Sequence, residues 1–388
     1  MREQCPVCGT EKSEVMFHRN FEEAQLLTPF RSYDVLCCPK CGMVYAGNIE
    51  ETMPLARYYD EMSKYDGDFY VNVLEQSYQS YYKKTVKYIL QNTSYSLIQD
   101  VLDIGSGSGG LLHAFEEQGF DASHLYGIEP SKQNCMFVQK QWNFNIYNGN
   151  IEDENFFSGQ KFHIITMACV LEHLTNLKIC MKRVSDFLCE KGYIFIEVPD
   201  LDTFYMNENL YQEFSKEHIN YFTIRSLSNL MVQFGFELLS FETQPDSIIS
   251  TLWQRTNTRK HDLICDNKGR DSLQKYFASC EKKIRPIKDI LSKLNNMSIY
   301  LWGAGTYTVM LSQLHLLDHI RVQGVFDSNT HFHGKHFLGQ KVLDPYHLMN
   351  RSKDRPILVV AKVPSIRADI VDTIRNKLCW ENPIILLK

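Results

Sequence analysis

The chain has 388 residues, 44% of them hydrophobic and 22% charged, with a formal net charge of −5. This length exceeds what one hydrophobic core usually serves, so we expect two or three globular domains. No apolar run approaches the roughly 18 residues of a membrane span, and no dense Lys/Arg cluster would neutralise a nucleic-acid backbone. The first residues, MREQCPVCGT, lack the apolar core of a signal peptide, so we expect a cytoplasmic protein without membrane or nucleic-acid partners.

Two Cys-x-x-Cys pairs, each followed by Gly, lie in residues 1–55. A two-residue spacer lets both thiolates of a turn reach one ion, and four sulfurs leave no open position, so the pairs predict a structural zinc site. Scattered buried cysteines or a redox-active pair are the alternative interpretation. Cys37 is the spare thiol, because the next cysteine keeps the spacing of the second pair. The predicted zinc ligands are Cys5, Cys8, Cys38 and Cys41.

Downstream of the cysteines, residues 58–90 have apolar side chains at helical spacing and are expected to form a helical connector. Strands and helices then alternate to about residue 244, as in a parallel sheet covered on both faces. A polar helix over 271–295 precedes a second, smaller α/β unit. The predicted domains are therefore residues 1–55, 56–245 and 246–388. Expected strands cover 96–104, 123–130, 143–149, 163–170, 193–198, 236–243, 298–305, 324–329 and 357–362.

Residues 101–110, VLDIGSGSGG, join the first of these strands to a helix through glycines. Glycines permit a tight turn and let a ligand approach the backbone at the helix N-terminus. The same letters fit a dinucleotide fingerprint, so the motif alone leaves a nicotinamide oxidoreductase open. Asp103, two residues before the first glycine, favours a cationic ligand over a pyrophosphate.

This arrangement resembles the first motif of the class I methyltransferases, whose methyl donor is S-adenosyl-L-methionine. Glu129, at the end of the next strand, offers a carboxylate that can accept from both ribose hydroxyls. The resemblance implies a Rossmann-like methyltransferase domain, with the residues after the third strand flanking the adenine. The cofactor-binding residues it implies are Asp103, Gly105, Gly107, Gly109, Glu129, Asn150 and Ile151.

Two Glu-His pairs follow later strands of the predicted sheet. Glu172-His173 resembles the EH sequence that many class I methyltransferases carry after the fourth strand, with a helix cap as the alternative. Glu217-His218 begins the segment EHINYFT after the fifth strand. Histidine can remove a proton near neutral pH, and an adjacent carboxylate or phenol can orient it. A structural histidine before a helix is the alternative for this segment.

The cysteine pairs, the glycine motif, EHINYFT and the terminal WGAG sequence together resemble the three-domain sugar C-methyltransferases over nearly the whole chain. The resemblance implies a base that removes the proton beside a ketone of a nucleotide-diphosphate sugar. One departure is Ser215, which stands where the family often has a tyrosine, so an oxygen or nitrogen acceptor stays open. The catalytic residues implied are His218 as base, Glu217, His173 and Tyr221 as assisting groups, and Tyr65 of the connector.

The C-terminal unit contains a strand, a glycine turn, a helix and a strand that ends in an acid, which is half of a nucleotide-binding fold. With the resemblance, we expect a nucleotide-sugar diphosphate there; a turn without a ligand is the alternative. The loop histidines His331, His333 and His336 have too irregular a spacing to predict a metal site. A non-catalytic module that binds a sugar nucleotide or a protein is a further alternative for the chain. The predicted substrate-binding residues are Gly303, Gly305, Thr306 and Asp327.

Overall fold

The computed structural model divides the chain into two compact units. The first comprises Met1–Arg19, Pro29–Glu208 and Glu213–Tyr276, and the second comprises Asn20–Thr28, Asn209–Gln212 and Phe277–Lys388. The described residues are all except 1, 3, 22–28, 54–57, 59–74, 95–98, 154–155, 158, 208–209, 245–246, 257, 259–262, 266, 352–353, 362–363, 382 and 388, and the side chains of 75–78, 306, 331 and 350 are also outside the description.

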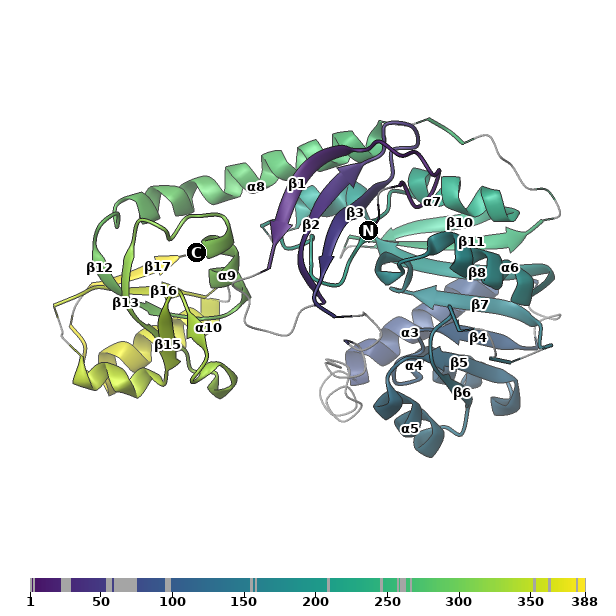
Figure 1. Ribbon diagram of the computed structural model, residues 1–388. Helices are drawn as coiled ribbons and strands as arrows, with labels where there is room; N and C mark the ends of the chain where they lie inside the picture. The colour runs from purple at the N-terminus through teal and green to yellow at the C-terminus, as the bar shows by residue number, and fades with distance from the viewer. Residues whose placement is uncertain are drawn as a thin grey trace. The chain divides into compact units, whose positions relative to one another are not determined.

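A seven-stranded sheet with the order β10-β11-β8-β7-β4-β5-β6 forms the centre of the first unit (Figure 1). Strands β4 to β8 run parallel, β11 pairs antiparallel with β8, and β10 pairs antiparallel with β11. The predicted Rossmann-like α/β class is therefore confirmed. The bounds are β4 Val101–Ile104, β5 Leu125–Glu129, β6 Asn145–Asn148, β7 Phe162–Ala168, β8 Leu188–Pro199, β10 Phe236–Gln244 and β11 Ile248–Arg255.

Helices cover both faces of this sheet. Successive residues of a strand point to opposite faces, so neighbouring residues of β4 pack into different cores. Leu102 of β4 belongs to the core that contains α6 and α7 side chains, whereas the preceding Val101 belongs to the core of α3, α4 and α5. The α-helices are α3 Glu75–Gln91, α4 Gly110–Glu116, α5 Lys132–Gln141, α6 Leu177–Phe187 and α7 Ile224–Met231, and the 3₁₀ turns are η2 Ala122–His124, η3 Leu171–His173, η4 Leu201–Met206 and η5 Val232–Phe234.

The strand order reverses between β4 and β7. Beyond β4 lie β5 and β6, and beyond β7 lies β8, so the chain leaves these two neighbouring strands toward opposite sides. In open parallel sheets such a reversal opens a crevice at the carboxyl ends of the strands, where ligands bind. The glycine motif follows β4 and the first Glu-His pair follows β7, so both predicted motifs lie at this place.

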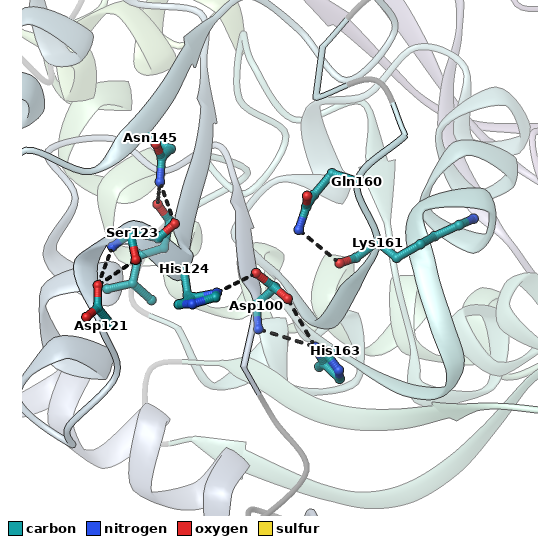
Figure 2. A network of polar contacts seen from close by, with 9 residues as sticks. Asp100, Asp121, Ser123, His124, Asn145, Gln160, Lys161 and His163 are labelled. Atoms are coloured by element: carbon teal, nitrogen blue, oxygen red, sulfur yellow. Dashed lines mark hydrogen bonds and ion pairs between the residues drawn. The ribbon is translucent and has the colours of Figure 1, made fainter.

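The opposite edge of the sheet, where the parallel strands begin, carries a polar network (Figure 2). Asp100, just before β4, is 2.8 Å from Nδ1 of His124 through one carboxylate oxygen and 3.6 Å from Nδ1 of His163 through the other. Asn145 at the start of β6 donates to the carbonyls of Ser123 and Leu125. We call this group of residues the amino-end network.

The N-terminal cysteine region forms strands that the sequence did not predict. They are β1 Glu14–Asn20, β2 Phe30–Cys37 and β3 Val44–Glu51, and the order β1-β2-β3-β9 adds a short strand, β9 Asn220–Tyr221, from the EHINYFT segment. The region has no core of its own, as expected. Val7 and Met43 lie in the same hydrophobic cluster as Leu177 of α6 and Leu227 of α7.

The second unit contains a six-stranded sheet with the order β14-β15-β13-β12-β16-β17. All pairs are parallel except β14 with β15, as expected for a second Rossmann-like unit. The domain boundary predicted at residue 245 falls inside the β10–β11 hairpin, and the structure places β11 in the seven-stranded sheet because it pairs with β8 along its length. The strands are β12 Ser298–Trp302, β13 Arg321–Phe326, β14 His336–Phe337, β15 Gln340–Leu343, β16 Ile357–Val360 and β17 Ile384–Leu387, and two helices are α9 Thr306–Gln313 and α10 Pro364–Asp372. Helix α8 Lys268–Ser292 begins in the first unit, and its residues from Phe277 onward belong to the second.

None of the helices in the described residues combines the length and the apolar composition that crossing a membrane requires.

Candidate functional site

The glycine loop between β4 and α4 has left-handed backbone at each of its predicted glycines. Gly105, Gly107 and Gly109 have φ values of 73°, 52° and 80°. A Cβ on Gly105 would lie 2.7 Å from Cγ2 of Val170, so close packing excludes a side chain there. A Cβ on Gly107 would have no atom within 4 Å. The loop therefore packs tightly at its first glycine and borders open space at its second, which leaves room for a ligand against bare backbone.

Glu129 ends β5 beside this loop and is 6% exposed. Its carboxylate accepts from the N–H of Gly107 at 2.9 Å and from the N–H of Ser131, before α5, at 2.8 Å. Burial raises the pKa of this carboxyl, and the backbone hydrogen bonds oppose the rise. The side-chain amide of Asn134 donates at 3.5 Å, and since a carboxylate offers about four acceptor positions, Glu129 retains capacity for a hydroxyl donor of a ligand.

Asp103 on β4 is buried within the sheet. It is 3% exposed and accepts from the hydroxyl of Thr166 on β7 at 2.7 Å. Burial raises its pKa to about 7, and Glu129 adds to the rise. A positive charge in the neighbouring crevice would favour the ionised form of Asp103.

The two predicted adenine-flanking residues follow β6. The Asn150 N–H donates to the carboxylate of Asp153 at 2.7 Å, which closes a local turn. Ile151 is 1% exposed and packs in the core on the α6 side of the sheet. The structure thus places this turn at the carboxyl end of β6, next to the strand that carries Glu129.

The two predicted histidines lie together. The rings of His173 in η3 and His218 have centroids 4.8 Å apart and meet edge to face. Nδ1 of His173 is 3.1 Å from the carbonyl oxygen of Glu217, so this nitrogen donates, and Nε2 is 3.8 Å from Oε1 of Glu172. The carboxylate of Glu172 and one nitrogen of each ring lie within 4.8 Å of one another.

A buried asparagine fixes the turn that carries His173. Asn220 on β9 is 1% exposed and donates to the carbonyls of Leu171 and Leu174, at 2.7 and 2.9 Å, which bracket η3. The backbone of Ile219 donates to the carbonyl of Glu172 at 2.8 Å. The EHINYFT segment and η3 therefore form one hydrogen-bonded assembly, although 44 residues separate their histidines.

Glu217 is 5% exposed and accepts from the hydroxyl of Tyr58 at 2.6 Å. The connector tyrosine that the resemblance implies, Tyr65, lies outside the described residues. Ser215, where the family often has a tyrosine, accepts through Oγ from the N–H groups of Glu217 and His218 at 3.2 and 3.0 Å. The serine therefore shapes the turn that presents this Glu-His pair.

The hydroxyl of Tyr221 contacts two groups near the paired histidines. Its hydroxyl donates to the carbonyl of His218 at 2.8 Å and lies 2.8 Å from the hydroxyl of Tyr33 on β2. Burial raises the pKa of the Tyr221 phenol well above its ordinary value. In this arrangement Tyr221 holds the backbone of His218 in place.

A second acidic residue at the same end of the strands, Glu197, was not predicted, whereas Glu172 belongs to the first predicted Glu-His pair. Glu197 on β8 is 1% exposed and accepts from the hydroxyl of Tyr81 on α3. Glu172 of η3 is also 1% exposed. Burial raises the pKa of Glu197, and it raises that of Glu172 to about 8. The sequence did carry a signal for Glu197, which is the only charged residue in the apolar strand YIFIEV.

The four predicted zinc ligands converge. Their sulfur atoms lie within 4.8 Å of one another, with 3.5 Å between Cys5 and Cys41 and 3.4 Å between Cys8 and Cys38. Tetrahedral zinc with Zn–S bonds of about 2.3 Å would place the sulfurs about 3.8 Å apart. The four thiols therefore fit such an ion, and the buried Cys37 lies outside the group.

In the second unit, the glycine turn after β12 and the acid after β13 are joined. Asp327 accepts from the N–H of Ala304 at 2.7 Å. Gly303 has φ of 118°, and a Cβ there would lie 2.3 Å from the carbonyl oxygen of Val360. A Cβ on Gly305, just before α9 and Thr306, would have no atom within 4 Å. The turn thus combines tight packing at its first glycine with open space at the helix start.

Residues 74–240 match the family model of a methyltransferase domain. A probable (S)-tetrahydroprotoberberine N-methyltransferase 2 of Papaver bracteatum is 27% identical over 103 residues, which are 26% of this chain and 28% of that protein. An (S)-tetrahydroprotoberberine N-methyltransferase of Eschscholzia californica is 26% identical over 115 residues, 28% of this chain and 32% of that protein. The matched segments thus span less than a third of these relatives.

Two solved structures are similar at low identity. CalS10 of Micromonospora echinaspora, an amino pentose methyltransferase, has 13% identity and a TM-score of 0.37, covering 48% of this chain and 97% of its own. DesVI of Streptomyces venezuelae has 14% identity and a TM-score of 0.39, covering 53% and 99%. The family match, which covers residues 74–240 and includes neither the cysteine region nor the residues from Phe277 onward, confirms the prediction of a methyltransferase.

Proposed function

We propose that this protein is an S-adenosyl-L-methionine-dependent methyltransferase that acts on a sugar linked to a nucleoside diphosphate. One observation carries the proposal. Val170, which leads into η3, lies against Gly105 of the glycine loop, so the turn that carries His173 packs beside the predicted donor loop where the strand order reverses between β4 and β7. A methyl donor and a proton-accepting histidine must be adjacent for methyl transfer to an acceptor.

The donor site would use the glycine loop and the acids beside it. Glu129 would accept from the ribose hydroxyls while it holds the N–H of Gly107. Asp103 would supply negative charge behind the loop when a bound positive charge favours its ionised form, since burial alone raises its pKa to about 7. When bound, S-adenosyl-L-methionine supplies an electrophilic methyl group on a positively charged sulfur.

His218 would act as the base. It would remove a proton from the carbon beside a ketone of the sugar, and the resulting enolate carbon would form the new bond to the methyl group. The methyl–sulfur bond breaks with its electrons left on sulfur, and the proton stays on the imidazole. Glu217 would stabilise the imidazolium, and Tyr221 would fix the loop through the carbonyl of His218. An oxygen or nitrogen acceptor would use the same base.

The second unit would hold the nucleotide part of the substrate. The open space at Gly305 and the N–H of the turn, with Asp327 ordering it from β13, suit a diphosphate. The four cysteines would bind a structural zinc ion. These two roles account for the parts of the chain outside the methyltransferase domain.

The test is methyl transfer observed by mass spectrometry. A panel of nucleoside-diphosphate keto-sugars is incubated with the full chain and S-adenosyl-L-methionine, and we expect a gain of one methyl group on at least one member. His218→Ala should lower the rate by about 10²–10⁴-fold, the contribution of a general base. The matched control is His124→Ala, which removes a histidine of the amino-end network and should leave the rate within about twofold.

Two results would contradict the proposal. Binding of NAD in place of S-adenosylhomocysteine would favour the oxidoreductase. Binding of a sugar nucleotide without any methylated product would favour the non-catalytic module. Thermal shifts with S-adenosylhomocysteine, NAD and a sugar nucleotide, run side by side, separate these outcomes because each ligand stabilises only a protein that binds it.

A further inference from the structure

Three side chains converge where the EHINYFT segment meets η3. The carboxylate of Glu172, one ring nitrogen of His173 and one ring nitrogen of His218 lie within 4.8 Å of one another. Within this group, Oε1 of Glu172 is 3.8 Å from Nε2 of His173. One carboxylate and two imidazoles are a donor set typical of transition-metal sites. The group shares no residue with the four-cysteine cluster.

The spacing of these atoms is close to that around a bound ion. Zinc bonds to imidazole nitrogen and carboxylate oxygen are about 2.0–2.2 Å long, so the ligand atoms of a tetrahedral ion lie about 3.4 Å apart. Nε2 of His173 and Oε1 of Glu172 exceed this spacing by about 0.4 Å, and the widest pair exceeds it by at most about 1.4 Å. Small rotations of the side chains close both gaps.

Hydrogen bonds outside the group orient His173 for this role. Its Nδ1 donates to the carbonyl oxygen of Glu217 at 3.1 Å, so the lone pair of the neutral ring is on Nε2, the nitrogen near Glu172. A metal-bound histidine usually donates its other ring N–H to a carbonyl or a carboxylate, and this bond fixes the ring. Asn220 in turn holds the two carbonyls that bracket η3.

The backbone of His218 is held on both sides of its side chain. Its N–H donates to Oγ of Ser215 at 3.0 Å, and its carbonyl accepts from the hydroxyl of Tyr221 at 2.8 Å. Both histidines are half-buried, and the side chain of His173 is 17% exposed, so an ion can reach the group past the two rings. Ligands on a fixed backbone are pre-organised for binding.

Glu172 brings a buried carboxylate that the fold satisfies incompletely. It is 1% exposed and accepts from its own backbone N–H, whereas its Oε2 has no hydrogen-bond partner within the described part of the chain. A buried carboxylate with few donors is unfavourable, and coordination of a cation is one arrangement that compensates it. An ion between the two histidines would supply that compensation.

We propose that Glu172, His173 and His218 bind a divalent transition-metal ion such as zinc or cobalt(II), as a second metal site besides the four cysteines. Imidazole ligands favour this class of ion over magnesium and calcium, which take oxygen ligands. Three protein ligands leave one coordination position open, whereas four thiolates leave none. With two neutral ligands, the site holds its ion less tightly than the cysteines do, so dialysis empties it first.

The bound ion has a consequence that rests on the proposed function. A neutral imidazole has one lone pair, so His218 cannot bind the ion and remove a proton from the acceptor at the same time. The ion is therefore an inhibitor of methyl transfer, and the chain is active when this site is empty and the cysteine site is filled.

The test is a cobalt(II) titration of the full chain whose cysteines hold zinc. Zinc stays on the thiolates because cobalt(II) binds such ligands less tightly. We expect one cobalt(II) per chain by metal analysis, with ligand-field absorption and without a thiolate-to-cobalt charge-transfer band. Glu172→Gln, His173→Ala and His218→Ala should each weaken binding by about 100-fold or more, since loss of an outer-shell partner alone costs about 10–100-fold.

The matched control is His124→Ala. The amino-end network also contains one carboxylate and two histidines, but Nδ1 of His163 accepts the N–H of Asp100 at 3.2 Å and is not available to an ion. This variant should therefore bind cobalt(II) as the wild type does. All four variants should keep the cysteine zinc and the circular dichroism of the wild type, which separates loss of the site from loss of folding.

A wild-type chain that binds no cobalt(II) beyond its zinc would overturn the proposal, as would a second ion that all three ligand substitutions retain. Inhibition is measured in the methyl-transfer assay, where the rate should fall with the midpoint of the absorption titration. An unchanged rate at saturating cobalt(II) would overturn the inhibition. Failure of the proposed function is a separate result, because it appears as absence of methyl transfer before any cobalt(II) is added.

Discussion

Acidic residues at the two ends of the parallel strands of the seven-stranded sheet lie in opposite environments. At the amino ends of the strands, Asp100 is paired with two histidines and Asp121 accepts from the N–H and hydroxyl of Ser123, all near solvent (Figure 2). At the carboxyl ends the acids are nearly inaccessible. Asp103, Glu129, Glu172 and Glu197 are 3%, 6%, 1% and 1% exposed, and burial raises the pKa of each.

The unfavourable burial of acidic groups is therefore found at the carboxyl ends of the strands. A polar network that is satisfied and near water needs no ligand to explain it. Buried acids with incomplete hydrogen bonding are destabilising by themselves, and they cluster at functional sites, where a ligand completes them. The same backbone architecture thus has one edge that stabilises the protein and one edge that is prepared for a bound molecule. Experiments can act on the two ends of the parallel strands separately.

The largest effect is expected from removing the proposed zinc ion. β3 of the cysteine region pairs with β9, with Val44 opposite Tyr221, so the EHINYFT segment depends on a strand that the cysteines anchor. A zinc chelator should increase hydrogen exchange of residues 217–223 by about tenfold or more, since structural zinc sites contribute about 10 kcal/mol to folding. Residues 99–100 and 121–125, at the opposite edge, should exchange as before.

Metal content measured in parallel provides the control. Cys37→Ser should retain one zinc ion per chain, and Cys38→Ser should lose it, although the two residues are adjacent. Unchanged exchange at 217–223 after complete zinc loss would show that the cysteine region does not hold the carboxyl edge.

The second effect concerns the donor site. Glu129→Gln places an amide where the N–H of Gly107 donates, and it removes the charge that would receive ribose hydroxyls. Affinity for S-adenosylhomocysteine should fall by about 100-fold, which corresponds to about 2.7 kcal/mol. Isothermal titration calorimetry measures this. The matched change at the amino edge is Asp121→Asn, which also faces an N–H two residues later, and it should leave the affinity within about twofold.

Sequence patterns identified the parts of the site that are local in the chain. The glycines around Gly107, the acid at Glu129 and the Cys-x-x-Cys turns each follow from a short motif, and the structure places them as a loop beside a strand end and as a four-sulfur cluster. The seven-stranded sheet was also largely predictable, because its parallel strands read as apolar runs separated by helices.

The missed features depend on contacts between distant segments. The two-residue strand β9 forms only because β3, from the distant N-terminal region, pairs with it, and Tyr58 reaches Glu217 across 159 residues. Glu197 is a single acid in an apolar strand, and nothing local shows that Glu172 lies near it. Such pairings are set by tertiary packing, which periodicity and motif spacing do not encode.

A third effect is the pH dependence of stability that Glu172 creates. Its pKa is about 8 in the folded protein against 4.5 in its ordinary environment, so the folded state binds more protons than the unfolded state between these values. The free energy of unfolding therefore falls as pH rises from about 4.5 to 8, by up to about 1.4 kcal/mol per pH unit. Glu172→Gln should remove about 2 kcal/mol of the decline between pH 5 and 7.

Urea unfolding at pH 5, 6 and 7 measures this slope. Glu116→Gln, a change on α4 at a partly exposed acid, serves as the control and should keep the wild-type slope. A slope that is the same in the wild type and in Glu172→Gln would mean that Glu172 ionises in the folded protein as readily as in the unfolded chain, and that the carboxyl edge does not carry the unfavourable charge described above.

The smallest effect belongs to the amino-end network itself. The side chain of His124 is 47% exposed and that of Asp100 is 13% exposed, so solvent and salt screen their interaction at 2.8 Å. His124→Ala should lower the free energy of unfolding by less than about 1 kcal/mol at low salt, and by less still in 0.5 M NaCl. His18→Ala removes a second exposed histidine–aspartate pair with the same 2.8 Å separation and should behave alike. A loss above about 2 kcal/mol for His124→Ala alone would place it among buried, cooperative networks, and the two edges would then differ in ligand binding but not in how strongly their charges hold the fold.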